Sequence, residues 1–147
     1  MQEIKQLCQA LQKNTCLLHF SSSGLPASPP AAEQFAIMLG HNKGLQSLGI
    51  GDGNLGDQAL AELAGGLKNN STLESLEMEH KGITAAGAKS LAEGLNGSSL
   101  KRLCIARNEI GDEGERCLIC SIAFFPQSQP QCQPRMLVHA HVQVRRP

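Results

Sequence analysis

The chain repeats itself, with steps of 28 and then 27 residues between equivalent leucines. Three segments align without a gap: LQSLGIGDGNLGDQALAELAGGL from residue 45, LESLEMEHKGITAAGAKSLAEGL from residue 73, and LKRLCIARNEIGDEGERCLICSI from residue 100. Apolar residues share columns in all three segments, among them Leu48, Leu76 and Leu103; Leu55, Ile83 and Ile110; and Leu63, Leu91 and Leu118. A period of this length, headed by L-x-x-L and an aliphatic residue, predicts a solenoid whose units are each a strand, a loop and a helix.

The same frame extends toward the N-terminus. Leu17 lies 28 residues before Leu45, and Phe20 falls in the column of Leu48. We predict parallel strands near 46–50, 74–78 and 101–105, and helices near 3–12, 31–40, 57–68, 86–95 and 113–122. Because Pro29 and Pro30 are excluded from a helix interior, the second helix is expected to begin near Ala31.

One stretch, Gly51–Gly56, fits the dinucleotide-binding pattern G-x-G-x-x-G between an apolar segment and an amphipathic one. The aligned repeats carry Lys81 and Asn108 in the column of Gly53, so a unit of this shape does not need the glycines. The pattern is therefore interpreted as the strand-to-helix loop of one repeat, and no cofactor is expected.

The amino-acid composition excludes some classes of binding partner. Lys+Arg and Asp+Glu number 13 each, and the chain has no Trp and no Tyr, so neither nucleic acid nor a membrane is expected as a partner. The N-terminal segment is polar and not a signal peptide, and no apolar run approaches membrane-spanning length. We therefore expect a cytoplasmic protein whose six cysteines are reduced thiols.

The strand motif, the N-x-I-G-D run beginning at Asn108 and the G-A-x-x-L-A-E-x-L helix beginning at Gly87 resemble the ribonuclease-inhibitor type of leucine-rich repeat. That type also occurs in nucleotide-binding innate immune sensors and in the GTPase-activating protein of Ran. The resemblance implies an α/β solenoid with parallel strands on its concave face and helices on its convex face. It covers residues 1–122, in about four units of which the first is partial or worn. Residues 123–147 are rich in Pro and Gln and weakly basic, and we expect this tail to be poorly ordered.

Residues that alternate with the core leucines should face the concave surface, because successive strand side chains point to opposite faces. Acids in one repeat then lie beside bases in the next. Two readings stay open: a ladder of salt bridges, Glu74 with Lys101 and Glu79 with Arg107, or a charged surface that binds a protein. The residues expected to contact a partner are Asp52, Glu74, Glu77, Glu79, His80, Lys101, Arg102 and Arg107.

No combination of nucleophile, base and orienting group recurs in the repeats, so no catalytic residue is expected. Cys117 and Cys120 form a CxxC without a second pair, and His139 and His141 lie in the tail, so no metal site is expected either. The favoured function is a non-enzymatic module that binds a protein partner, or other domains of a longer chain, as part of a larger regulatory protein. An innate immune sensor is one example of such a regulatory protein. The alternative is a GTPase regulator similar to the Ran activator.

Overall fold

The computed structural model describes residues 2–22, 28–51, 53–123 and 137–138. Five helices and five strands occur in these ranges, in the order α1 (Gln2–Lys13), β1 (His19–Ser21), α2 (Pro29–His41), β2 (Ser47–Gly49), α3 (Gly56–Lys68), β3 (Ser75–Glu77), α4 (Ala85–Leu95), β4 (Arg102–Cys104), α5 (Gly111–Ala123) and β5 (Leu137–Val138). Every strand and helix predicted from the repeat frame is present, which confirms the α/β repeat architecture.

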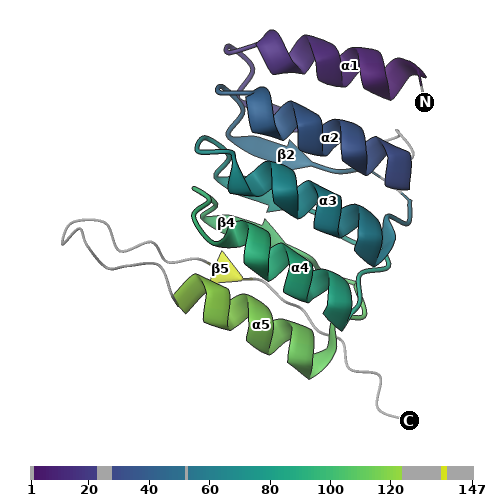
Figure 1. Cartoon of the computed structure of the whole chain (residues 1–147), viewed down its shortest axis with the longest axis vertical. Coiled ribbons are helices and arrows are strands. Elements are labelled where there is room, and N and C mark those ends of the chain that lie inside the picture. Colours follow the sequence, from purple (N-terminus) through teal and green to yellow (C-terminus); the bar gives the residue numbers. More distant parts are fainter. Residues whose placement is uncertain (1, 23–27, 52, 124–136, 139–147) are drawn as a thin grey trace, which may run out of the picture.

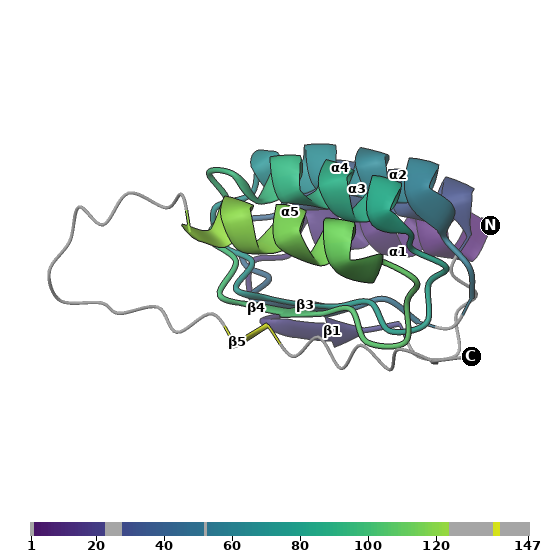
Figure 2. The same cartoon turned by 90° about the horizontal axis from the view of Figure 1, so that it is seen from below.

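The elements form two layers. The strands make one parallel sheet in the order β1-β2-β3-β4-β5, so each strand pairs with the strand that precedes it in the chain. The helices stack side by side in chain order (Figure 1), and all of them cover one face of the sheet (Figure 2). Among the described residues, no helix covers the other face of the sheet (Figure 2), where the sequence predicts the partner-binding residues to lie.

The core lies between the two layers and is built from the repeat columns. In the sheet, Phe20, Leu48, Leu76 and Leu103 lie in register across four strands. Leu48, Leu76 and Leu103 are fully buried, and Phe20 packs partly buried against the same core. Leu63 and Leu91, which occupy the same column of the repeat in α3 and α4, belong to the same buried core on the side of the helices. The apolar columns were therefore a correct prediction of the core.

The start of α2 differs from the prediction. The helix begins at Pro29, not near Ala31, and both prolines lie in its first turn. The first N–H groups of a helix have no partner inside it, so proline loses nothing there and its fixed φ suits the helix. The N–H groups of Ala31 and Ala32 both donate to the carbonyl of Ser28.

The fifth strand is not required by the repeat frame. Leu137 and Val138 pair in parallel with β4, with Val138 opposite Leu103. Residues 124–136 and 139–147 of the tail, including His139 and His141, lie outside the described residues. None of the helices in the described ranges has the length and apolar character needed to cross a lipid bilayer.

Candidate functional site

The helix-free face of β3, β4 and the loops after them carries a set of charged side chains, here called the charged strand face. Strand alternation directs Glu77 and Arg102 to this face, because their neighbours Leu76 and Leu103 point into the core. The other members immediately precede or follow the two strands. Glu74 is half-buried and the remaining members are exposed. The charged strand face consists of Glu74, Glu77, Glu79, His80, Lys101, Arg102 and Arg107. Asp52, the eighth predicted residue, lies outside the described residues.

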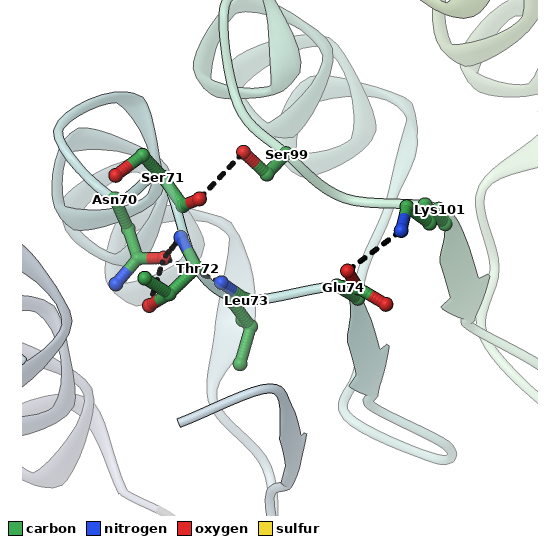
Figure 3. Close-up of polar contacts among 7 residues, drawn as sticks. All are labelled: Asn70, Ser71, Thr72, Leu73, Glu74, Ser99 and Lys101. Atoms are coloured by element: carbon green, nitrogen blue, oxygen red, sulfur yellow. Dashed lines mark hydrogen bonds and ion pairs between the residues drawn. The ribbon is translucent and has the colours of Figure 1, made fainter. Parts of the chain in front are cut away.

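One of the two predicted salt bridges is present. Lys101 Nζ lies 2.6 Å from Glu74 Oε1, and the pair is visible in Figure 3. The two side chains keep 59% and 44% of their area exposed, so water screens the pair and its contribution to stability is small.

The second predicted pair, Glu79 with Arg107, is wrong. Glu79 Oε1 instead accepts a hydrogen bond from the Cys104 thiol at 3.2 Å. Arg107 lies beyond the end of β4 and has a φ of 58°, as His80 has a φ of 55° in the preceding repeat. The register that pairs Glu77 with Cys104 sets Glu79 opposite Ala106 and not Arg107, and the N–H of His80 donates to the Ala106 carbonyl at 3.1 Å. Within the described residues, Arg107, Arg102 and Glu77 form no ion pair.

Cys104 is the one thiol on the charged strand face, and it is half-buried there. Its pKa is raised, first by burial and then by the hydrogen bond to Glu79 and the negative charges of Glu79 and Glu77, against a lowering contribution from the Ala106 backbone. A raised pKa keeps the thiol protonated at neutral pH and so unsuited to nucleophilic chemistry. Cys8 is buried in the core, where burial raises its pKa to about 11.

No group of three or more His, Cys, Asp or Glu side chains that could hold a metal ion occurs in the described part of the chain. Cys117 is half-buried and Cys120 is exposed, both on α5.

The loop with the dinucleotide-binding pattern is tied to its neighbouring repeats. The N–H of Gly51 donates to Ser22 Oγ at 2.7 Å, and the N–H groups of Leu55 and Gly56 donate to the carbonyl of Lys81 at 3.0 and 3.2 Å. A phosphate-binding loop must direct such N–H groups at its ligand. Here they hold adjacent repeats together, which supports the structural interpretation of the pattern.

We therefore expect NAD, ATP and GTP to show no saturable binding to the chain in calorimetry at micromolar concentrations. Gly53 and Gly56 have φ of 128° and 70°, so in this repeat the two glycines serve the backbone conformation of the loop. Micromolar binding of any of these nucleotides that Gly53→Val abolishes would contradict this interpretation.

Asp57 and Thr84 connect the loops of two adjacent repeats. Asp57 Oδ1 accepts from the Thr84 N–H at 2.8 Å, and Thr84 Oγ1 donates to Asp57 Oδ2 at 2.6 Å. Burial raises the pKa of Asp57, but hydrogen bonds from the Thr84 side chain, the Thr84 backbone and the Gly87 backbone outweigh it, so the net pKa is lowered. Thr84 also caps α4, because its side chain accepts from the N–H of Ala86.

This lowered pKa predicts an acid-dependent loss of stability. The ionised carboxylate stabilises the folded chain above its unfolded pKa of about 3.9, and that contribution disappears as the pH falls through the folded value. The melting temperature of the wild type should exceed that of Asp57→Asn at pH 6, and the difference should shrink below about pH 4. A difference that stays constant from pH 6 to pH 3 would rule out this role.

Two asparagines that the sequence reading did not single out hold the helix-to-strand turns. Asn70 Oδ1 accepts from the N–H groups of Thr72 and Leu73 (Figure 3). Asn70 Nδ2 donates to the carbonyls of Leu39 and Asn42 in the preceding repeat. Asn42 makes the equivalent contacts one repeat earlier. The signal was available, since both residues stand three positions before a leading leucine. These buried amides hold the turns that lead into β2 and β3 against the preceding repeats.

Comparison with known proteins gives the same architecture. Residues 69–92 and 98–118 match the family described as Leucine Rich repeat. The chain is 33% identical over 86% of its length to the ribonuclease inhibitor of Sus scrofa, and 30% identical over 96% to NACHT, LRR and PYD domains-containing protein 5 of Homo sapiens. It spans 27% of the first relative and 12% of the second.

Two solved structures share the fold. A structure titled leiomodin-1 actin-binding site 2 superimposes with a TM-score of 0.70 at 22% identity, covering 83% of this chain and 73% of the other. The tropomodulin C-terminal domain of Caenorhabditis elegans gives a TM-score of 0.69 at 14% identity, covering 83% and 74%. At these identities the likeness concerns the fold alone.

Proposed function

Because the chain is built from leucine-rich repeats of the ribonuclease-inhibitor type, we propose that it is a protein-binding module whose charged strand face holds the partner. The proposal rests on two arginines of this face, Arg102 and Arg107, that are exposed and unpaired within the described residues. Both are exposed on a rigid repeat scaffold, and within the described residues neither is engaged in an ion pair. Arginine is favoured at the centre of protein interfaces, where its guanidinium supplies several directed donors.

The acids of the same surface support this proposal. Glu77 is exposed beside β4, so a partner that covers both strands meets positive and negative charge within a short distance. Complementary charges fix the register of a complex and suppress wrong partners. The Glu74–Lys101 pair leaves both side chains substantially exposed, so a partner can compete for either one.

The names of the relatives suggest which proteins to test first. One relative is named for inhibition of a ribonuclease, and one structural neighbour is titled an actin-binding site. We propose a ribonuclease and actin as the first two partners to assay. No arrangement within the described residues favours the GTPase-regulating alternative over simple binding, and a GTP-hydrolysis assay with the chain added would separate the two.

Reversing one charge tests the surface. Arg102→Glu is expected to weaken binding of the partner at least about tenfold, because a charge that is reversed inside an interface is costly. The same change should alter the melting temperature little, because exposed charges contribute little to stability. Biolayer interferometry and thermal melting provide the two readouts.

The matched control is Lys89→Glu, an equal charge reversal at an exposed position of α4 in the helical layer. Its affinity should equal that of the wild type. Equal losses for Arg102→Glu and Lys89→Glu, or no loss for either, would place the binding surface elsewhere. Failure of both proteins to bind the wild type would remove these two partners from the proposal.

A further inference from the structure

His80 and Arg107 share an uncommon backbone conformation. Their φ angles of 55° and 58° lie in the left-handed region, which residues other than glycine rarely adopt. The two residues hold the same position in successive repeats, because the register that pairs Glu77 with Cys104 sets His80 opposite Arg107. Each lies three residues beyond the end of its strand, in the loop that leads to the next helix.

Hydrogen bonds between the repeats impose this conformation. The N–H of His80 donates to the carbonyl of Ala106 at 3.1 Å, and the N–H of Lys81, the next residue, donates to Asn108 Oδ1 at 2.7 Å. Asn108 Nδ2 also donates to the Ala106 carbonyl at 3.2 Å, so bonds are made on both sides of Arg107. A strained backbone persists only where the surrounding structure fixes it, as these bonds do.

Neither side chain makes a polar contact that would explain the strain. Both are exposed, and within the described residues neither forms an ion pair or a side-chain hydrogen bond. Glycine adopts a positive φ without steric cost, and the chain uses it for that purpose at Gly82 and Gly111, with φ of 65° and 59°. A histidine and an arginine in this conformation therefore cost stability that glycine would not, which indicates a role outside the fold.

We infer that His80 and Arg107 are specificity-determining contacts to the partner protein, an inference that rests on the proposed function. Imidazole and guanidinium groups supply directed hydrogen-bond donors. The fixed backbone sets where each side chain leaves the loop, and such preorganisation reduces the loss of freedom on binding. The partner accordingly covers the strand-to-helix loops after β3 and β4 as well as the strands themselves.

Paired substitutions separate the side chain from the backbone at each position. Alanine removes the side chain and keeps the strain, whereas glycine removes both. Arg107→Gly is expected to melt about 2–4 °C above Arg107→Ala, and His80→Gly should likewise melt above His80→Ala. All four variants should weaken the binding of ribonuclease or actin by at least about fivefold in biolayer interferometry, because all four lack the contact.

Two further variants calibrate these readouts. An added Cβ at Gly111 meets nothing within 4 Å, so Gly111→Ala introduces strain without a collision and should lower the melting temperature. Lys89→Ala removes an exposed cation from α4, away from the charged strand face, and should bind ribonuclease or actin as the wild type does.

The outcomes separate this inference from the proposed function. A loss of affinity for Arg102→Glu with none for the four variants overturns the role of His80 and Arg107 and leaves the charged strand face as the binding surface. Weaker binding of the glycine variants alone assigns the effect to the loop backbone and overturns the contact role. Glycine variants that melt below their alanine counterparts overturn the strain. Failure of both ribonuclease and actin to bind the wild type overturns the proposed function with these partners and the inference with it.

Discussion

Replacing Leu76 with alanine is expected to lower the free energy of unfolding by about 2–5 kcal/mol. Leu76 is fully buried, and in register it has Leu48 on one side and Leu103 on the other. Truncation removes its apolar contacts and leaves a cavity that parallel strands on both sides cannot close. Urea denaturation monitored by far-ultraviolet circular dichroism measures the change.

The neighbouring position provides the control for this prediction. Glu77 follows Leu76 on β3 but is exposed on the helix-free face. Glu77→Ala should change the free energy of unfolding by no more than about 0.5 kcal/mol, as is usual for surface substitutions. Similar losses for both variants would contradict the assignment of the two faces of the strand.

The substitution Gly66→Ala should also destabilise the chain, by about 1–3 kcal/mol. A Cβ added at Gly66 would collide with the carbonyl oxygen of Ala36 and come within 2.7 Å of the Ala36 Cα. These are backbone atoms of α2, so no side-chain rotation relieves the collision and the two helices must separate. Gly94 of α4 has the same relation to α3, because an added Cβ would lie 2.5 Å from the carbonyl oxygen of Ala64.

Gly65→Ala is the matched control, because Gly65 is adjacent in the same helix and an added Cβ meets nothing within 4 Å. Alanine has the higher helix propensity, so this variant should gain about 0.5–1 kcal/mol. Opposite signs for the two substitutions in one denaturation series are the expected result. A stabilising effect of both would mean that α2 and α3 are not in close contact at Gly66.

The sequence was sufficient to predict the architecture because the core is periodic. Leu48, Leu76 and Leu103 recur at the repeat length. Because they occupy the same position in successive strands, they are buried on the same face of the sheet. The close approach of helices at Gly66 was not predictable in the same way. It depends on the distance between two helix axes, and Gly65 beside it has no such neighbour. A glycine alone in a sequence does not distinguish these two cases.

The charged strand face was predictable in position but not in its contacts. Alternation along β3 and β4 correctly placed Glu77 and Arg102 on the exposed face. The predicted pairing of Glu79 with Arg107 failed, because the register sets Glu79 opposite Ala106 and its carboxylate accepts a hydrogen bond from Cys104 instead.

The claim that the charged strand face binds a protein is tested most directly by lysine labelling of the complex. Lys101 lies on that face with 59% of its side chain exposed, and Lys89 is exposed on α4 in the helical layer. An amine-reactive reagent followed by mass spectrometry gives the labelling rate of each lysine, with and without bound ribonuclease or actin. The proposal predicts that the partner slows labelling of Lys101 severalfold and leaves Lys89 unchanged. Protection of Lys89 with no change at Lys101 would contradict it.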